Sequence, residues 1–419
     1  MANLFKKIWW KIKLFSARIY YGNPSKKLKI IGVTGTNGKT TTTTLLYKTA
    51  SLLGHKSGLI GTVEILINGQ KFEPKGKVPA TTPDSVTLTK VFAEMVKAGC
   101  EYVFMEVSSH AVDQNRIAGI KFAGGIFTNL THDHLDYHKT FKNYFEAKKK
   151  FFDGLPASAW ALTNADDEYG KRMTEDTKAQ VFYYGFDYKK DTNSIDPTKQ
   201  DFLGIIESLT STGTKIKVNN YHEIDTHLIG GFNAYNLSAV FGATALLGFD
   251  TGKVIHILEN IEPPRGRFER VIGSSGVIGL VDYAHSPDAV HNVLTTINQI
   301  KGKNKVISVF GCGGDRDSSK RAAMGEIGAQ LSDIAIFTSD NPRSENPNEI
   351  IEAMKNNLTP EIAGKVLIFP DRGEAIRVAA GYAEAGDIIA VLGKGHEDYQ
   401  EVNGTKNHFS DIEELQKIL

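Results

Sequence analysis

The chain has 419 residues, 41% of them hydrophobic and 23% charged, which is typical of a soluble globular protein with two or three domains. The 49 basic and 48 acidic residues leave a net charge of +1, which argues against nucleic acid as a partner. No apolar run reaches the ~18 residues needed to span a bilayer. Cys100 and Cys312 lie far apart without metal-ligand spacing, so we expect a cytoplasmic protein with no disulfide.

Residues 1–27 form a basic amphipathic segment. Lysine and arginine occur in it without any acid, and Phe5, Ile8, Trp9 and Ile12 recur at helical spacing. This pattern is typical of a helix that lies in a membrane interface. Two interpretations stay open: peripheral contact with the inner face of the membrane through residues 1–20, or docking of the apolar stripe on the protein's own surface.

The stretch Val33–Thr41, VTGTNGKTT, is typical of a phosphate-binding loop. An apolar strand is expected over 28–33 and a helix over 40–53. A strand, a glycine-containing loop and a helix in this order place phosphates at a helix N-terminus. The common motif has a glycine where this chain has Val33, so we expect a tighter loop that binds a nucleoside triphosphate.

The loop is followed by a hairpin over 64–71 that turns at Asn68-Gly69, and by a helix that Asp84 caps and that ends near Ala98. An apolar strand over 102–106 then ends in Glu106. A carboxylate at this place beside a nucleotide is a candidate magnesium ligand. Polar side chains suited to an anionic substrate follow within ten residues, namely Ser108, Ser109, His110, Gln114 and Arg116. Equally, Ser-Ser-His is a common helix start.

A strand over 125–128 leads into a cluster of titratable residues: His132, Asp133, His134, Asp136 and His138. Their place next to a nucleotide site predicts metal or phosphate contact for at least one of them. The helix expected over 140–152 carries Lys148, Lys149 and Lys150, and such a run is typical of a solvated face. Residues 184–222 are rich in Lys, Asp, Thr and Ser and predict an exposed β excursion.

A glycine turn at Gly230-Gly231 precedes a helix that ends near Leu247, and Asn233 and Asn236 share one face of it, where they could read an adenine edge. Residues 263–267, PPRGR, predict a hinge. Beyond it, strands are expected at about 277–281, 305–310, 334–338, 365–369 and 387–392, alternating with helices. This order predicts a second open α/β domain whose polar loops converge at the carboxyl ends of the strands.

A series of ordered motifs links the chain to a known family: GTNGKTT (35–41), TTP (81–83), EVSSH (106–110), DHLDYH (133–138), DYAH (282–285), GCGGDRD (311–317), DNPR (340–343) and GKGHEDYQ (393–400). In these motifs it resembles the Mur ligases from about residue 28 onward. Within that family it is similar to the enzymes that add the third peptide residue to UDP-N-acetylmuramoyl-L-Ala-D-Glu.

The resemblance implies an α/β fold: a central P-loop ATPase-like domain with a mostly parallel sheet, followed by a Rossmann-like C-terminal α/β domain. The expected boundaries are 1–27 for the N-terminal segment, 28–262 for the ATP-binding domain, 263–275 for the linker and 276–419 for the amino-acid-binding domain. Mur ligases usually begin with a separate UDP-binding domain, whereas fewer than thirty residues precede the first strand here. We therefore expect uridine to be bound elsewhere, by a partner chain, or not at all.

The resemblance also implies roles by position. The ATP-binding residues are Gly35, Thr36, Asn37, Gly38, Lys39, Thr40, Thr41, Asn236, Arg267, Asp282 and His285. The ligands of two Mg²⁺ ions are Thr40, Glu106, His134 and a carbamylated Lys148, which reverses the solvated-face interpretation for that lysine alone. The catalytic set is Lys39, Glu106, His134 and Lys148. The acceptor-binding residues are Thr81, Thr82, Ser108, Gln114 and Arg116, and the amino-acid-binding residues are Arg316, Asp340, Asn341, Arg343, Gly393 and Glu397.

The implied reaction is ATP-dependent amide formation through an acyl phosphate, with a muramoyl dipeptide acceptor and meso-diaminopimelate as substrates. The physical reason for diaminopimelate is that Arg343 can take its distal carboxylate bidentately, while acidic or amide groups take the ammonium. Closure about the hinge would exclude water from the acyl phosphate. Two alternatives remain: a related ligase acting on a carrier without UDP, and an ATP-binding scaffold at the membrane surface that no longer ligates.

Overall fold

The computed structural model describes residues 19–74, 81–186 and 201–419, and the chain divides into two compact units. The first unit comprises Met1–Ser208, Thr214–His227 and Phe232–Glu262. The second comprises Leu209–Gly213, Leu228–Gly231 and Pro263–Leu419. Residues 1–18 of the basic segment lie outside the described residues, so both interpretations of the segment remain predictions.

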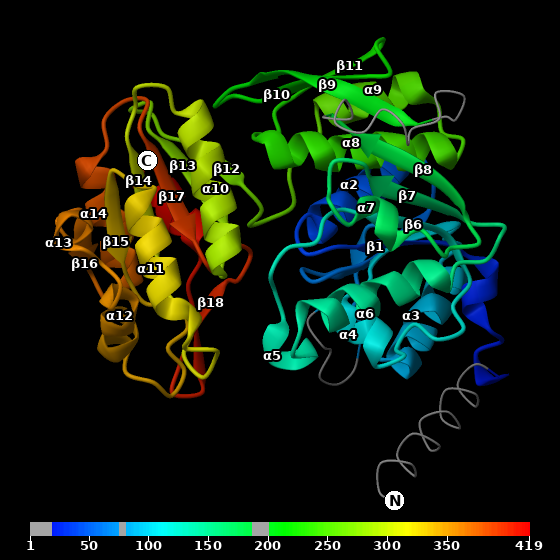
Figure 1. Cartoon of the computed structure of the whole chain (residues 1–419), viewed down its shortest axis with the longest axis horizontal. Coiled ribbons are helices and arrows are strands. Elements are labelled where there is room, and N and C mark those ends of the chain that lie inside the picture. Colours follow the sequence, from blue (N-terminus) through cyan, green and yellow to red (C-terminus); the bar gives the residue numbers. More distant parts are fainter. Residues whose placement is uncertain (1–18, 75–80, 187–200) are drawn as a thin grey trace, which may run out of the picture. The chain divides into compact units, whose positions relative to one another are not determined.

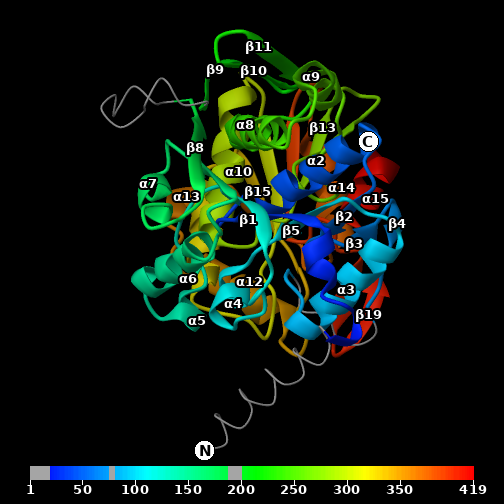
Figure 2. The ribbon, with the colours of Figure 1, turned by 90° about the vertical axis from the view of Figure 1, so that its right-hand side faces the viewer.

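An 11-stranded sheet runs through the first unit in the order β11-β10-β9-β8-β7-β6-β1-β5-β2-β3-β4. β1, the strand before the phosphate loop, pairs in parallel with β5 and β6, and Figure 2 shows β1 and β5 side by side. The carboxyl ends of these three strands therefore share one edge. The bounds are β1 Lys29–Thr34, β2 Ser57–Ile60, β3 Ile65–Ile67, β4 Gln70–Lys71, β5 Tyr102–Glu106, β6 Phe122–Phe127, β7 Trp160–Asn164, β8 Gln180–Gly185, β9 Phe202–Leu209, β10 Thr214–Val218 and β11 His222–Thr226.

Helices cover both faces of this sheet: α2 and α8 lie on one face, and α3, α4 and α6 on the other (Figure 1). Phe92 and Met95 of α3 and Phe151 and Phe152 of α6 are buried in one apolar cluster with the strands. The bounds are η1 Pro24–Lys27, α2 Lys39–Leu52, α3 Ser85–Lys97, α4 Ser109–Asp113, α5 Leu135–His138, α6 Phe141–Asp153, α7 Gly170–Met173, α8 Gly231–Leu246 and α9 Thr251–Glu259.

The expected exposed excursion at 184–222 is instead part of the main sheet where the structure describes it. β9 continues the sheet in parallel from β8, and β10 and β11 pair antiparallel at its edge. One face is packed, because Phe202 and Ile216 are buried and Ser238 Oγ of α8 donates to the Phe202 carbonyl at 3.3 Å. The predicted β structure is confirmed where the structure describes it, but the predicted exposure was wrong. The polar residues alternate with buried apolar ones, which is the pattern of a half-buried strand.

The second unit contains a six-stranded sheet in the order β12-β13-β17-β14-β15-β16, parallel except for the β12–β13 pair. Alternate residues of β14 face different helices: Ile307 and Val309 pack with α14 and α15, whereas Phe310 contacts Gly328 of α11. The strands are β12 Glu269–Ile272, β13 Ile278–Asp282, β14 Val306–Phe310, β15 Ile334–Phe337, β16 Val366–Ile368, β17 Ile388–Leu392, β18 Tyr399–Val402 and β19 Thr405–His408. The helices are α10 Pro287–Ile300, α11 Lys320–Gln330, α12 Pro347–Lys355, α13 Pro360–Ala363, α14 Arg372–Tyr382 and α15 Asp411–Ile418.

Local sequence signals explain several element ends. Asp84 begins α3 by accepting hydrogen bonds from the backbone of Val86 and Thr87, as predicted. The β3–β4 hairpin turns at Asn68 and Gly69, whose φ angles of 48° and 86° fit the left-handed turn that Asn-Gly favours. No helix in the part of the chain that the structure describes combines the length and apolarity needed to cross a bilayer.

Cys100 in the first unit and Cys312 in the second are both free and buried. Burial raises the pKa of the Cys100 thiol and raises that of Cys312 to about 12. Both thiols are therefore protonated at neutral pH.

Candidate functional site

The phosphate loop, residues 35–38, is held from behind by the segment that follows β6. Thr128 Oγ1 donates to the Asn37 carbonyl at 2.6 Å, and the Asn37 amide donates to Asn129 Oδ1 at 2.8 Å. Gly35 has φ 153°, and a Cβ there would lie 1.8 Å from Thr128 Oγ1. Glycine is therefore required at 35 by space as well as by conformation.

Two lysines converge on the Gly35 carbonyl. Lys39 Nζ donates to it at 3.0 Å and to the Thr36 carbonyl at 2.7 Å, and Lys148 Nζ donates to it at 2.6 Å. Lys148 is buried, with Nζ 4.6 Å from the centre of the Tyr144 ring. Complete burial, helped by the nearby Lys39 ammonium, holds the pKa of Lys148 well below its ordinary value. The amine of Lys148 is thus biased toward its neutral, nucleophilic form.

Glu106 ends β5 with its side chain almost fully buried, at 1% exposure. One carboxylate oxygen accepts from the Thr62 amide at 2.7 Å and the other from Thr62 Oγ1 at 3.0 Å. A buried ionised carboxylate needs such donors or a cation. Thr62 therefore orients Glu106.

The five predicted acceptor-binding residues lie in one connected network. Thr82 Oγ1 donates to the Glu106 carbonyl at 2.9 Å and accepts from the Ser108 amide at 3.2 Å. Arg116 donates to the Thr82 carbonyl at 2.7 Å and, through Nε and Nη2, to Gln114 Oε1. Thr81 joins through its hydroxyl oxygen, which lies 3.1 Å from Thr62 Oγ1. Ser108 also caps α4, so the helix-start interpretation of Ser-Ser-His holds alongside the proposed role.

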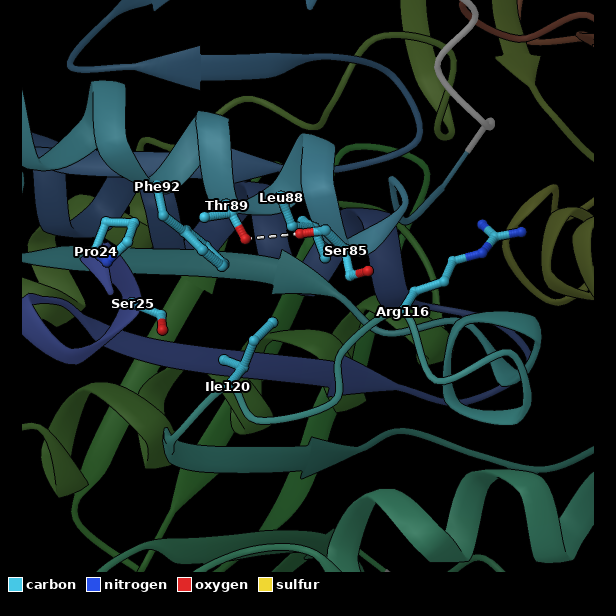
Figure 3. Close-up of a pocket in the computed structure, with 8 residues that line it drawn as sticks. All are labelled: Pro24, Ser25, Ser85, Leu88, Thr89, Phe92, Arg116 and Ile120. Atoms are coloured by element: carbon cyan, nitrogen blue, oxygen red, sulfur yellow. Dashed lines mark hydrogen bonds between the residues drawn. The ribbon is translucent and has the colours of Figure 1, made fainter. Parts of the chain in front are cut away.

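A small pocket lies beside this network, between η1 and α3 (Figure 3). Pro24, Leu88, Phe92 and Ile120 give it apolar walls, and Figure 3 shows the guanidinium of Arg116 extending away from the Pro24 end. It has room for about one water molecule, which is too little for a peptide. The acceptor therefore has no place in this pocket.

His134 lies among aromatic rings, 4.9 Å from His110 and 6.1 Å from Tyr144 between ring centres. Desolvation, opposed by Asp133 and helped by Lys39, lowers the pKa of His134 to about 4. The imidazole is neutral at physiological pH, which is the form that binds metal ions. His138, in the same cluster, shares a 2.9 Å hydrogen bond with Ser109 Oγ.

Within the described ranges, no group of three or more His, Cys, Asp or Glu side chains converges as a ready-made metal site. Glu106 offers Mg²⁺ the carboxylate oxygen that it prefers, neutral His134 offers a nitrogen, and Thr40, with its hydroxyl, stands in the first turn of α2. The unmodified amine of Lys148 offers the ion no oxygen ligand, and its protonated form would repel the ion. These donors therefore fit a magnesium ion that also takes oxygens from phosphate.

Lys149 is buried, so the solvated-face interpretation of the lysine run was wrong for this residue as well as for Lys148. Its side chain is 5% exposed and its Nζ lies 2.8 Å from Asp153 and 2.5 Å from Asp176. Lys149 is therefore a buried structural partner of two carboxylates, while its neighbour Lys148 faces the phosphate loop.

Asn236 packs against the same loop from α8. Its Oδ1 accepts from Thr42 Oγ1 at 3.2 Å, its Nδ2 donates to Asn233 at 3.0 Å, and a Cβ on Gly38 would lie 2.5 Å from that oxygen. This geometry favours a role near the phosphates over the adenine contact considered for Asn233 and Asn236.

In the second unit, the predicted amino-acid residues gather where β15 and β17 end. Asp340 and Asn341 are buried, and Asn341 Nδ2 donates to Glu397 Oε2 at 2.8 Å. Burial and the nearby Asp340 raise the pKa of Glu397. Gly393 follows β17 with φ 114° and donates to the Asp282 carbonyl at 3.0 Å. Two carboxylates and an amide thus line one small region.

Arg343 is fixed by the β18–β19 hairpin. Its Nε lies 3.4 Å from Glu401 Oε2, its Nη1 donates to the Gly314 carbonyl at 2.7 Å, and its backbone bridges to Val402. Its φ of 53° is in the left-handed region, which arginine rarely adopts. Arg316, in the loop after β14, is exposed.

The three nucleotide-side residues of the second unit surround Tyr283. The Arg267 guanidinium lies 4.7 Å from the Tyr283 ring centre, and His285 Nδ1 is 2.8 Å from the Tyr283 carbonyl oxygen. Asp282 accepts from the backbone amides of Phe268 and Ala284 at 2.8 and 2.9 Å, and burial raises its pKa. Both oxygens of Asp282 thus shape the protein's own turn.

Sequence reasoning missed the residues that hold the site in place: Thr62, Thr128, Asn129, Tyr144, Lys394 and Glu401. Only Lys394 stood inside a recognised motif, as a lysine between two glycines. The others carry no local signal, because their partners are distant in the sequence.

Comparison with known proteins places the chain in a family. A model described as the Mur ligase middle domain matches residues 33–244, and one described as Mur ligase, glutamate ligase domain matches residues 266–395. The chain is 49% identical over 400 residues to the UDP-N-acetylmuramoyl-L-alanyl-D-glutamate–2,6-diaminopimelate ligase of Cytophaga hutchinsonii, covering 96% of this chain and 79% of the relative. The proteins with that name from Parabacteroides distasonis and Aquifex aeolicus are 50% and 43% identical, with 95% and 96% of this chain and 79% and 80% of the relatives covered.

Solved structures agree with this. A UDP-N-acetylmuramoyl-L-alanyl-D-glutamate–2,6-diaminopimelate ligase superposes with a TM-score of 0.66 at 32% identity, covering 93% of this chain and 78% of the other. Folylpolyglutamate synthase of Mycobacterium tuberculosis shares the fold, with a TM-score of 0.70 at 17% identity over 91% of this chain and 92% of the other. The predicted α/β fold class is confirmed. The chain belongs to the Mur ligase family.

Proposed function

We propose that this chain is an ATP-dependent ligase that joins meso-diaminopimelate to the D-Glu carboxylate of UDP-N-acetylmuramoyl-L-Ala-D-Glu in peptidoglycan synthesis. The relatives that are about half identical over nearly the whole chain carry the name of this activity. Enzymes of the family use ATP with Mg²⁺. The proposal rests mainly on one group of side chains in the second unit, where Asp340 and Glu397 lie close to Arg343. Two carboxylates and a guanidinium are complementary to the ammonium and the carboxylate at one end of diaminopimelate.

The residues of the first unit would activate the acceptor. Backbone amides of residues 35–41 and Lys39 would bind the phosphates of ATP, and the network from Thr81 to Arg116 would orient the acceptor carboxylate for attack on the γ-phosphate. Magnesium bound near Thr40, Glu106 and His134 would spread the negative charge of the transferring phosphoryl group. The product of this step is an acyl phosphate on the acceptor, with ADP released.

The residues of the second unit would supply the nucleophile. Asp340 and Glu397 would hold one ammonium of diaminopimelate while Arg343 takes the neighbouring carboxylate, with Arg316 as a further cation. The other amine then attacks the acyl carbon, loses a proton and displaces phosphate. Lysine lacks the carboxylate that Arg343 would bind, which favours diaminopimelate.

Lys148 would act after covalent modification. Its neutral amine would add to CO₂ and lose a proton, giving a carbamate with two oxygen ligands in place of an ammonium. The lowered pKa supports this, because only the neutral amine reacts. Residues 1–20 would contact anionic membrane weakly, and recognition of UDP would require a site or partner outside the network described above.

The test is mass spectrometry of the products formed from ATP and a mixed pool of acceptors, with and without UDP, and of amino acids that include diaminopimelate and lysine. A single product that contains diaminopimelate and the UDP-linked dipeptide is expected. A product on a carrier without UDP would favour the related ligase, and ADP release independent of any amino acid would rule out the proposal. Binding of ATP without turnover would favour the scaffold.

A further inference from the structure

Lys394 is a buried cation in the second unit that the mechanism above does not use. It follows β17 and its side chain is fully buried, at 0% exposure. Its Nζ donates to Asn341 Oδ1 at 3.1 Å and lies 3.6 Å from both Asp340 Oδ1 and Glu397 Oε2. A lysine in this position contacts three of the proposed amino-acid-binding residues at once while solvent cannot reach it.

The contacts of Asn341 show what this lysine does to the amide. Asn341 Oδ1 accepts from Lys394 and also from the Glu401 backbone amide at 2.9 Å. A carbonyl oxygen has two lone pairs, so Oδ1 is saturated by the protein. Asn341 Nδ2 donates one hydrogen to Glu397 and keeps its second for another acceptor. The amide can therefore offer a ligand only a donor, which suits a carboxylate and not an ammonium.

The charges around Lys394 lead to the complementary conclusion for the carboxylates. Asp340 and Glu397 face it directly, and Arg372 of α14 and Asp411 of α15, a bidentate pair with both contacts at 2.7 Å, lie behind it. When Arg343 and its partner Glu401 are counted as well, three cations face four carboxylates, which leaves one unbalanced negative charge. Asp340 Oδ1 is buried and has no hydrogen-bond partner among the residues described. The cluster is thus short of one positively charged donor.

We propose that Lys394 is a positioning residue for the amino-acid substrate: it fixes Asn341 as a donor to the substrate carboxylate and leaves the Asp340–Glu397 pair able to accept one substrate ammonium. This inference rests on the proposed function. Without Lys394 the pair would carry an additional unbalanced charge, and Asn341 Oδ1 would keep the Glu401 amide as a donor but lose the second one, so the amide would be held less firmly. The lysine would then act on specificity without touching the substrate.

The pH dependence follows from the same contacts. Around Glu397 lie Asp340, Lys394, Arg343 and Tyr283, and burial with Asp340 already raises its pKa. Lys394 opposes that rise. An opposite charge at this distance typically lowers a carboxyl pKa by about 1–3 units, so removing it raises the pKa by a similar amount. Substrate binding needs the ionised carboxylate. As the pH is lowered, binding by the variant would therefore begin to weaken at a higher pH than binding by the wild type.

The experiment compares wild type, Lys394→Met and Lys406→Met in the ligation assay across pH. Lys406 is a matched control, because it is an exposed lysine of the adjoining hairpin that stacks on Tyr399 without reaching Asn341. For Lys394→Met we expect the KM for diaminopimelate to rise by about tenfold or more, with the KM for ATP unchanged. In the pH profile of kcat/KM for diaminopimelate, the acidic limb should move up by about one pH unit or more. The control should behave as the wild type.

A folded Lys394→Met variant with the wild-type KM and acidic limb would overturn the inference. Where this variant does not fold, Lys394→Gln keeps a donor without the charge, and its acidic limb must still move to higher pH; an unmoved limb overturns the inference equally. Wild-type enzyme that forms no product with diaminopimelate would instead refute the proposed function, so the two failures are distinguishable.

Discussion

Replacement of Lys148 by methionine separates a chemical role from a structural one. The side chain is fully buried, and its hydrogen bond to the Gly35 carbonyl is worth about 1 kcal/mol of net stability. Lys39 continues to donate to that carbonyl at 3.0 Å, and methionine removes the cost of burying an amine. The free energy of unfolding should therefore change by no more than about 1 kcal/mol. Turnover should fall by about 10²–10³-fold, the typical effect of losing a group that stabilises transition-state charge.

The measurement combines ADP release in a coupled assay with unfolding in urea, and Lys149→Met is the matched control. Lys149 is the adjacent buried lysine, but it pairs with Asp153 and Asp176, which are 37% and 70% exposed. Its loss should lower stability by about 1 kcal/mol and spare turnover, because the stranded carboxylates remain partly hydrated. Turnover of Lys148→Met within twofold of the wild type would refute the carbamate role. An equal loss of turnover in both variants would show that the effect is structural.

Three further predictions concern the phosphate loop and the second unit. Gly35→Ala should abolish ATP binding measured by calorimetry, since the added Cβ would lie 1.8 Å from Thr128 Oγ1. The control is Gly381→Ala on α14, where a Cβ meets no atom within 4 Å; it should bind ATP normally and be slightly more stable. Arg372→Met should lower the free energy of unfolding in urea by about 3–5 kcal/mol, because it leaves the buried Asp411 carboxylate without its partner. The double variant Arg372→Met with Asp411→Leu should recover most of this stability, and an equal loss in both variants would contradict the prediction. Burial and Arg267 hold the pKa of His396 at about 4, below the unfolded value of 6.5, so the unfolded chain binds more protons between these limits and stability should fall as the pH falls from about 6.5 to 4. His396→Asn should flatten that fall, and an unchanged slope in urea titrations would reject the assignment.

The sequence predicted those parts of the fold that local patterns encode. Strand β5 has the predicted bounds, Tyr102–Glu106, because four apolar or aromatic residues precede the carboxylate at its end. Helix α6 begins after Thr140, whose hydroxyl accepts from the Asn143 amide, and such caps are readable in one dimension. The five strands β13 to β17 lie within a residue or two of the expected ones, because each is a short apolar run, whereas β12, β18 and β19 were not predicted.

What the sequence could not predict is the support of the site by residues distant along the chain. Thr62 reaches Glu106 across 44 positions and Asn37 reaches Asn129 across 92. Threonine and asparagine are common in loops, so neither composition nor periodicity marks these as different from any other turn. The contact of Arg343 with the β18–β19 hairpin depends likewise on a turn geometry, with φ 53°, that no propensity favours. Such pairings follow from the sheet order and not from the local pattern.

The two buried cysteines allow the opening of each unit to be timed in the unmodified protein. A thiol reagent reacts with the thiolate, and the raised pKa values of Cys100 and Cys312 make both nearly inert while their surroundings stay closed. Labelling must then wait for a local or global opening, and peptide mapping of the adduct tells which unit opened. Because the chain has one cysteine in each unit, substrates that tighten the first unit should slow labelling at Cys100, and those bound by the second should slow it at Cys312.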